Sequence, residues 1–344
     1  MTFKIPHKVI ISGEFSCIFG YPVLTTTIPL YIAVEVNYSA RTRKENIVIR
    51  TSDKETVAFA IESEAVSGDL VEQLYRQICS YLNARDQLGL HDVTITFGAT
   101  AFVSYGLGSS ANFLIALFLS ICEVAQIPCL DKQWLASHFV FLKALEDQFH
   151  GKSSGIDILT ILKSEFALYA KENDKWVSPC TTVESLAFWM LLVKSHKPKN
   201  TKSSVSDLLK QLNTDSVTTQ QRIEAIGRTT VDIFNHVARG YDIEKLHSLL
   251  NTNQDLLTKL RLSDQSIDNI VENLGTLGIG AKLTGGGRGG CVISLLSEQE
   301  HNMQKTAISS LLEKDYEFHW FYIKTEEAPG IQRIEHSNQS QSEE

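Results

Sequence analysis

The side chains best suited to chemistry in this sequence are one lysine and two carboxylates in apolar surroundings. Lys8 begins an apolar run, Glu146 lies near the end of an apolar segment, and Asp157 stands between Ile156 and Ile158. Such a set could serve phosphoryl transfer to an alcohol, which needs a carboxylate near the acceptor hydroxyl, cations to spread charge and ligands for Mg²⁺. Each residue also has an ordinary explanation. Lys8 could reach solvent, Glu146 could be a surface charge, and Asp157 could cap a helix.

Residues 104–111 form a glycine- and serine-rich stretch that could bind an anion. Gly106 and Gly108 allow the backbone to bend sharply and to approach a ligand closely, and Ser109 and Ser110 could cap a following helix. Backbone N–H groups at a helix N-terminus, together with the positive end of the helix dipole, suit a phosphate. A tight turn with a serine cap would use the same residues, so the rest of the chain has to decide between the two.

The segments on either side of this stretch predict a strand and a helix. Residues 92–97 alternate apolar and polar side chains, with Val93, Ile95 and Phe97 on one face, which is typical of a half-buried strand. Residues 112–125 are apolar almost all round, which predicts a buried helix. The glycine stretch is therefore expected to join a strand to a helix N-terminus.

Two further glycine-bearing segments lie at residues 12–20 and 284–290. The Walker pattern Gly-x4-Gly-Lys-Ser/Thr is absent from the sequence, which excludes a P-loop enzyme. Phosphate binding would instead depend on residues 104–111. One serine hydroxyl and one carboxylate beside that loop would suffice for Mg²⁺, which keeps phosphates and water among its ligands.

Length and composition limit the class of protein. A chain of 344 residues exceeds the usual single core, so we expect two domains with a boundary near residues 180–190. The net charge of −8 argues against a general binder of nucleic acid or anionic membranes. Six cysteines without a Cys-x-x-Cys pair indicate neither a zinc site nor a disulfide framework. No signal peptide and no apolar stretch long enough to span a membrane is evident, so a cytoplasmic location is expected.

Strands and helices alternate without a regular strand–helix–strand rhythm, which predicts an α+β fold. Besides the two elements above, strands are expected at residues 8–11, 28–38, 46–50, 166–169, 187–193, 291–294 and 319–324. Helices are expected at 70–83, 131–149, 266–274 and 298–313, with two or three more between 204 and 264. Residues 158–162 could be either helix or strand. Residues from about 331 are polar and predict a disordered tail.

Three segments resemble the signature motifs of the GHMP small-molecule kinases and occur in the order typical of that family. They are Lys8-Val-Ile-Ile-Ser-Gly-Glu14, Gly106-Leu-Gly-Ser-Ser-Ala111 and Lys282-Leu-Thr-Gly-Gly-Gly-Arg-Gly-Gly290. Within this superfamily the chain is most similar to the mevalonate kinases. The similarity lies in Phe149-His-Gly-Lys-Ser-Ser-Gly-Ile-Asp157, Lys197-Pro-Lys-Asn-Thr-Lys202 and Asn253-Gln-Asp-Leu-Leu257. Altogether the resemblance covers about residues 4–330.

The resemblance implies a role for each matching residue. Asp157 matches the catalytic aspartate, Lys8 the lysine that pairs with it, and Ser110 and Glu146 the magnesium ligands. The residues implied in ATP binding are Ser104, Gly106, Leu107, Gly108, Ser109, Ser110 and Ala111. Those implied near the substrate are Glu14, His150 and Thr201, and the third glycine motif contributes Gly285, Gly286 and Gly287.

The family's fold implies an N-terminal domain like ribosomal protein S5 (residues 1–185), a ferredoxin-like C-terminal domain (186–330) and a tail (331–344). Its activity implies ATP- and Mg²⁺-dependent phosphorylation of the primary hydroxyl of mevalonate, giving 5-phosphomevalonate and ADP for isoprenoid precursor synthesis. ATP and a small hydroxy acid are the expected partners, with neither nucleic acid nor membrane, and a homodimer is an open expectation. Phosphomevalonate, homoserine or a sugar as acceptor, and a nucleotide sensor without catalysis, remain alternatives.

The sequence departs from the family pattern mainly around the substrate. Phe15 stands where the family has histidine, Lys199 replaces an arginine, and Ile158 replaces an asparagine after the catalytic aspartate. The proline usual before the phosphate loop is missing, and Arg288 replaces a glycine of the third motif. We expect Arg288 to face solvent rather than the phosphates. None of these departures changes the lysine, the aspartate or the metal ligands, so they bear on the substrate more than on the reaction class.

Overall fold

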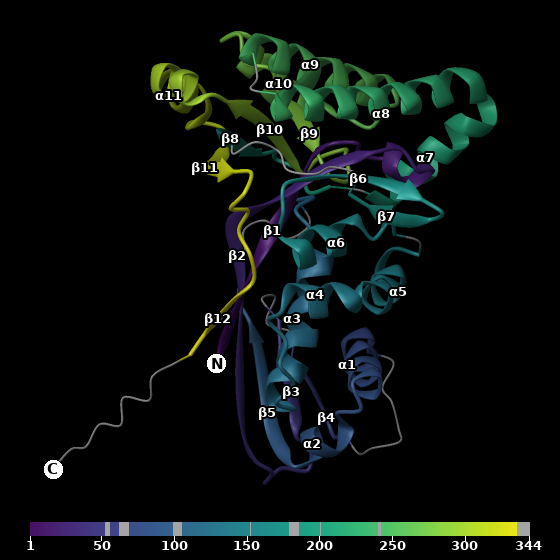
Figure 1. Ribbon diagram of the computed structural model, residues 1–344, viewed down its shortest axis with the longest axis vertical. Helices are drawn as coiled ribbons and strands as arrows, with labels where there is room; N and C mark the ends of the chain where they lie inside the picture. Colours follow the sequence, from purple (N-terminus) through teal and green to yellow (C-terminus); the bar gives the residue numbers. More distant parts are fainter. Residues whose placement is uncertain are drawn as a thin grey trace, which may run out of the picture.

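The computed structural model describes residues 1–51, 56–61, 69–98, 105–151, 153–178, 186–199, 201–239 and 242–335. For His150, Thr201 and Lys202 it describes the backbone alone. The described strands form two sheets, one of eight strands and one of four. Figure 1 shows the smaller sheet above the larger one, with a layer of helices over its upper face. None of the described helices is long and apolar enough to cross a membrane.

The larger sheet has the strand order β12-β1-β2-β5-β3-β4, and β6 extends it by pairing with both β2 and β7. All described pairs are antiparallel except β3 with β5. The strands are β1 (Thr2–Ser12), β2 (Val23–Ala40), β3 (Ile47–Arg50), β4 (Thr56–Phe59), β5 (His91–Phe97), β6 (Ala167–Glu172), β7 (Lys175–Val177) and β12 (Gln332–Ile334).

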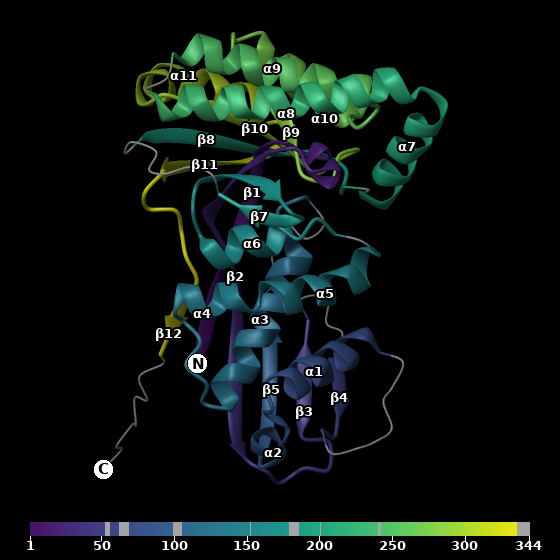
Figure 2. The same ribbon diagram turned by 45° about the vertical axis from the view of Figure 1, so that its right-hand side comes forward.

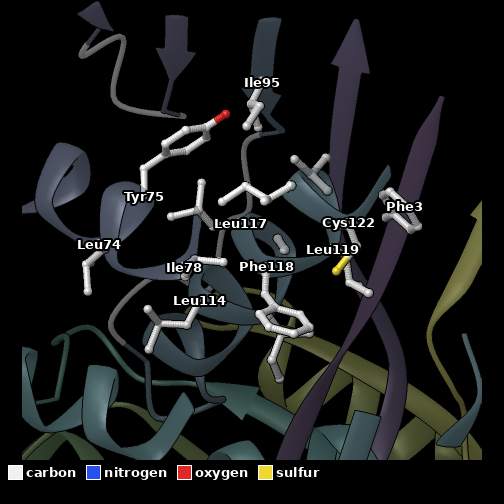
Figure 3. Packing of buried hydrophobic residues seen from close by; sticks show 14 of the residues in the cluster. Phe3, Leu74, Tyr75, Ile78, Ile95, Leu114, Leu117, Phe118, Leu119 and Cys122 are labelled. Carbon is white, nitrogen blue, oxygen red and sulfur yellow. The ribbon is translucent and has the colours of Figure 1, made fainter. Parts of the chain in front are cut away.

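Helices cover one face of the larger sheet, with α3 at the centre of the layer (Figure 2). These helices are α1 (Leu70–Tyr81), α2 (Arg85–Gly89), α3 (Ser109–Val124), α4 (Lys132–Ser137), α5 (Phe139–His150) and α6 (Ile156–Lys163). Figure 3 shows Leu114, Leu117 and Phe118 of α3 among apolar side chains from α1 and the strands. Because α3 is buried nearly all round, it holds the glycine stretch before it in a fixed place.

The smaller sheet has the order β11-β8-β10-β9, and its described pairs are all antiparallel. It consists of β8 (Ala187–Lys194), β9 (Lys282–Thr284), β10 (Cys291–Leu296) and β11 (Glu317–Lys324). The helices packed with it are α7 (Thr201–Thr214), α8 (Ser216–Ala238), α9 (Ile243–Lys259), α10 (Gln265–Gly275) and α11 (Glu298–Leu312). One apolar cluster joins Val9 and Ile11 of β1 to Met190 and Leu192 of β8, so the two sheets share a core.

Several predicted elements are confirmed. The half-buried strand is β5, with Val93, Ile95 and Phe97 buried, and the buried helix is α3. The apolar run at residues 187–193 is β8, which lies between β11 and β10 inside its sheet. Residues 158–162 belong to helix α6, and three helices cover residues 201–259. The boundary predicted near residues 180–190 stays a prediction, because residues 179–185 lie outside the described part of the chain.

The structure corrects three expectations. The helix expected over residues 131–149 is two helices, α4 and α5, because the chain turns at His138, whose ring packs against Trp134 and Phe118. The serines of the glycine stretch do not cap α3; Gly108, with a left-handed backbone (φ 82°), is its N-cap. Residues 332–334 of the expected disordered tail form strand β12, which pairs with β1. Residues 336–344 of that tail lie outside the described residues.

Candidate active site

A pocket lies where the end of β1, helices α5 and α6, and the two later glycine loops meet. Lys8, Glu146 and Asp157 line it together with Gly106 and Gly285. These residues come from segments far apart in the chain, and the pocket joins them as the sequence predicted. Phe15, Ile18 and Val205 contribute apolar side chains to the lining.

Lys8 and Asp157 form an ion pair inside this pocket, with 2.7 Å between Nζ and Oδ1. The Lys8 side chain is 1% exposed and Asp157 is 22% exposed, so the lysine does not extend to solvent. Asp157 lies in the first turn of α6, whose N-cap is Gly155, so the aspartate does not cap the helix. A buried cation beside a half-buried carboxylate suits a reaction in which negative charge develops on a bound oxygen.

Glu146 is 3% exposed. The ordinary explanation that it is a surface charge is therefore excluded. Burial, and next the negative charge of Asp157, raise its pKa to about 7. Lys199 also lines the pocket. Burial lowers the pKa of Lys199, while the nearby Asp157 acts in the opposite direction. Two cations and two carboxylates are thus held together in one poorly hydrated place, as is common at sites of catalysis.

The glycine stretch at residues 105–111 touches Lys8 through its backbone. Lys8 N donates a hydrogen bond to the carbonyl of Leu107 at 3.3 Å, and a Cβ added at Gly108 would lie 3.0 Å from Lys8 Cγ. Leu107 and Ala111 are themselves buried, so their side chains contribute to packing. Ser109 and Ser110 form the first turn of α3, whose positive dipole end lies at this loop. Ser104 lies outside the described residues.

The third glycine motif is in backbone contact with the phosphate-loop candidate. A Cβ at Gly285 would lie 2.6 Å from the carbonyl oxygen of Gly106, and one at Gly287 would lie 2.5 Å from that of Leu262. Gly286 also lines the pocket. Arg288 is not among the residues that line the described pocket, and its side chain is 26% exposed. Its guanidinium pairs with Asp207 of α7 at 2.7 Å, and its Nε donates to the carbonyl of Arg261 at 3.0 Å.

Of the three residues that the resemblance implies near a substrate, Glu14 has a described side chain, whereas His150 and Thr201 have a described backbone alone. Glu14 lines the pocket, His150 is the last residue of α5, and Thr201 is the first residue of α7. Val205, one turn into α7, does line the pocket, so the beginning of that helix lies at the site.

Sequence reasoning missed Lys282. Its side chain is fully buried and forms an ion pair with Glu14, 268 residues away in the sequence. The one signal in the sequence was a lysine placed between Ala281 and Leu283, where an apolar residue would be expected in a buried strand. The nearby Phe15 has a positive φ (61°, with ψ −41°). A bulky residue rarely adopts such a backbone conformation, and conformations of this kind are concentrated at functional sites.

The residues of the pocket fit Mg²⁺ and a nucleotide phosphate. Among the described residues, no three His, Cys, Asp or Glu side chains come together as a metal cage. Mg²⁺ does not need such a cage, since it is held by one or two carboxylates with phosphates and water. The buried carboxylate of Glu146 would supply that contact, with Ser110 of the adjoining helix turn as the candidate hydroxyl ligand.

Comparisons with known proteins show which proteins this chain resembles. The family model "GHMP kinases C terminal" matches residues 238–313. The mevalonate kinase of Methanocaldococcus jannaschii is 25% identical over 92% of this chain and 97% of its own. A crystal structure of the Methanococcus jannaschii mevalonate kinase superposes with a TM-score of 0.75 at 23% identity, covering 94% of this chain and 98% of its own.

Phosphomevalonate kinase from Streptococcus pneumoniae, solved with phosphomevalonate and AMPPNP, gives a TM-score of 0.73 at 18% identity. It covers 94% of this chain and 100% of its own. At these identities the structural likeness establishes the α+β fold of the family and does not distinguish one acceptor from another. The family model over residues 238–313, the relatives matched along most of the chain and the shared fold make this chain similar to the GHMP kinases, and among them to the mevalonate kinases.

Proposed function

We propose that this protein transfers the γ-phosphoryl group of ATP to the primary hydroxyl of mevalonate, giving 5-phosphomevalonate and ADP. The observation that carries the proposal is the buried Lys8–Asp157 pair, which lines one pocket with the two glycine loops and Glu146. The names of the curated relatives, which are mevalonate kinases matched along most of their length, support the choice of acceptor.

Lys8, Asp157 and Glu146 each have a role in this reaction. Asp157 accepts or orients the proton of the acceptor hydroxyl, and Lys8 stabilises the negative charge that develops on the hydroxyl oxygen. Glu146 and Ser110 hold Mg²⁺, and the loop at residues 106–111 holds the phosphates at the positive end of α3. When bound, Mg²⁺ neutralises phosphate charge. The apolar wall at Phe15 and Val205 excludes water from the reacting groups.

Phosphomevalonate is the second candidate acceptor, because a phosphomevalonate kinase shares the fold almost equally well. A phosphate on the acceptor would add about two negative charges to the pocket. Lys199 is the one cation lining the described pocket besides Lys8, and Lys8 is already paired with Asp157. This charge balance favours an acceptor with a single carboxylate.

The test is a coupled assay for ADP with Mg²⁺, ATP and either mevalonate or phosphomevalonate. We expect turnover of mevalonate. Asp157→Asn should lower kcat by about 10²–10⁴-fold, since it removes the proton acceptor, while binding of a non-hydrolysable ATP analogue by calorimetry stays close to normal. Asp174→Asn, at an exposed turn between β6 and β7, is the matched control and should keep full activity. Near-normal turnover by Asp157→Asn would disprove the assignment.

A further inference from the structure

The third glycine motif contacts two different parts of the pocket lining. At its beginning, Gly285 is in backbone contact with Gly106 of the phosphate-loop candidate. At its end, Gly290 N donates a hydrogen bond at 2.8 Å to the carbonyl of Lys197, two residues before Lys199, which lines the pocket. The motif therefore lies between the proposed nucleotide side of the pocket and the segment that leads into α7.

Arg288, in the middle of this motif, binds the beginning of helix α7. Its Nη1 donates to Oδ2 of Asp207 at 2.7 Å and to Oγ of Ser203 at 3.5 Å. Its Nε donates to the carbonyl of Arg261 at 3.0 Å, which fixes the orientation of the guanidinium plane. Figure 2 shows α7 at one end of the helix layer, at a steep angle to α8. The arginine thus attaches the first two turns of α7 to the glycine motif.

The backbone conformation of Arg288 shows that this attachment has a cost. Its φ is 56°, in the left-handed region that residues other than glycine seldom adopt. Glycine, which is usual at this position of the motif in the GHMP kinases, would adopt the same conformation without strain. The bonds from the Arg288 side chain to Asp207 and Arg261 are interactions that offset this cost, and glycine could not make them.

The part of α7 that Arg288 holds also contributes to the pocket. Val205 lines the pocket, and Asp207 follows it by two residues on the same helix. Lys199, six residues before Val205, lines the pocket as well. Lys8 and Asp157, by contrast, come from β1 and α6 of the larger sheet and its helices. The lining opposite the catalytic pair therefore comes from a segment that the third glycine motif holds in place.

We propose that Arg288 is a positioning residue for the acceptor. By attaching α7 to the third glycine motif, it keeps Val205 and Lys199 in place around the acceptor, whereas nucleotide binding depends on the contact at Gly285. This inference rests on the proposed function and adds to it a residue that acts on the acceptor alone. A lining that is ordered in advance binds its ligand more tightly, because less conformational entropy is lost on binding.

The decisive variant is Arg288→Gly, which removes the ion pair and leaves a backbone that glycine adopts without strain. We expect KM for mevalonate to rise about three- to fivefold, as the loss of a partly exposed ion pair allows. We expect kcat and KM for ATP to stay within about twofold of the wild type, because the catalytic pair and the phosphate loop are not touched. Arg288→Lys keeps the charge without the planar fork and should restore part of the affinity.

Hydrogen exchange gives a second measurement that does not depend on activity. Followed by mass spectrometry, the backbone amides of residues 205–211 should exchange faster in Arg288→Gly than in the wild type. Asp207→Asn should raise KM for mevalonate like Arg288→Gly, and the double variant should be no worse than either single one. Lys210→Ala is the matched control, because Lys210 also pairs with Asp207 (3.0 Å) but belongs to the same helix and is 73% exposed. It should leave both KM and exchange unchanged.

An unchanged KM for mevalonate in Arg288→Gly overturns the inference, whether or not exchange becomes faster. An equal rise of KM for mevalonate in Lys210→Ala overturns it too, since the charge near Asp207 would then matter rather than the attachment of α7. So does an equal rise of KM for ATP in Arg288→Gly, since the arginine would then not act on the acceptor alone. A wild-type protein that phosphorylates phosphomevalonate but not mevalonate contradicts the proposed function instead, and the same variants are then compared with phosphomevalonate.

Discussion

Glu146 and Asp157 show how two carboxylates of one pocket can take different roles. Asp157 is partly exposed and has its charge neutralised by Lys8 at 2.7 Å. Glu146 is buried, and its pKa is raised to about 7, mainly by that burial and next by Asp157. A carboxyl group that is costly to ionise in the metal-free protein is well suited to receive a cation, because the cation supplies the missing compensation.

This difference predicts a titration near neutral pH. In the metal-free protein Glu146 should be protonated below about pH 7 and ionised above it. Its infrared carboxyl band, identified as the one missing from Glu146→Gln, should therefore disappear as the pH rises through that value. Mg²⁺ with an ATP analogue should move the midpoint to lower pH, since a bound cation favours the ionised form. A midpoint near the ordinary value of 4.5 in the metal-free protein would contradict the prediction.

At the scale of residues, local sequence carried most of the information about the reaction but little about long-range partners. Lys8, Glu146 and Asp157 could be selected because each is a charge set in an apolar run. The pairing of Lys282 with Glu14 could not be predicted in this way. The two residues are 268 positions apart in the sequence, and their contact depends on how the two sheets pack against each other. For the same reason, the ion pair between the partly exposed Arg288 and Asp207 of α7 was not predicted.

At the scale of elements, the two glycine loops at the pocket hold each other through direct backbone contact. Gly106 and Gly285 both have positive φ angles (93° and 81°), and a side chain on either would meet the backbone at the other loop. The loop before α3 and the loop after β9 therefore act as one unit. A shift of the smaller sheet relative to the larger would therefore move the backbone of the loop before α3, which is proposed to bind phosphate.

Gly285→Ala should therefore impair stability and nucleotide binding together. The added Cβ would lie 2.6 Å from the Gly106 carbonyl oxygen in a backbone conformation that alanine disfavours. We expect a loss of about 1–3 kcal/mol in the free energy of unfolding and weaker binding of an ATP analogue, measured by denaturant titration and calorimetry. Gly275→Ala at the end of α10, where a Cβ meets nothing within 4 Å, should be neutral or slightly stabilising. Equal effects of the two variants would argue against coupled loops.

Elements with a clear apolar period were predictable, and those held by tertiary contacts were not. β5, α3 and β8 follow directly from their patterns of apolar residues. The turn at His138 was missed because the ring contacts with Phe118 and Trp134 and the hydrogen bond to Tyr81 leave no trace in hydropathy. β12 was missed because a polar strand is stabilised by backbone pairing with β1 and by the ion pairs of Arg333 with Glu123.

At the scale of the whole molecule, the last described segment of the chain runs from the smaller sheet back to the larger one. After β11 in the smaller sheet, the chain returns along the larger one, where the hydroxyl of Thr27 donates to the carbonyl of Pro329 at 2.6 Å. β12 then pairs with the outer edge of β1, and Ile331 packs on the main core (Figure 1). This C-terminal segment, residues 325–335, covers an edge of β1 that would otherwise be open to other strands.

Truncation should separate the role of β12 from that of the residues after it. A chain that ends at residue 330 should lose the pairing with β1, and we expect Tm to fall by about 2–6 °C, with more aggregation on heating and nearly unchanged kcat. A chain that ends at residue 335 retains β12 and is the matched control. Identical melting curves for the two chains would show that β12 adds nothing to the stability of the larger sheet.

The position of β12 also has a consequence for synthesis on the ribosome. Its partner β1 is synthesised before it, and β12 follows more than 300 residues later. Throughout that interval the outer edge of β1 is without its neighbour, although most of the larger sheet has already been made. A nascent chain of this protein therefore presents an unpaired strand edge until β12 has been made, and chaperones that bind exposed strand edges would have a long opportunity there.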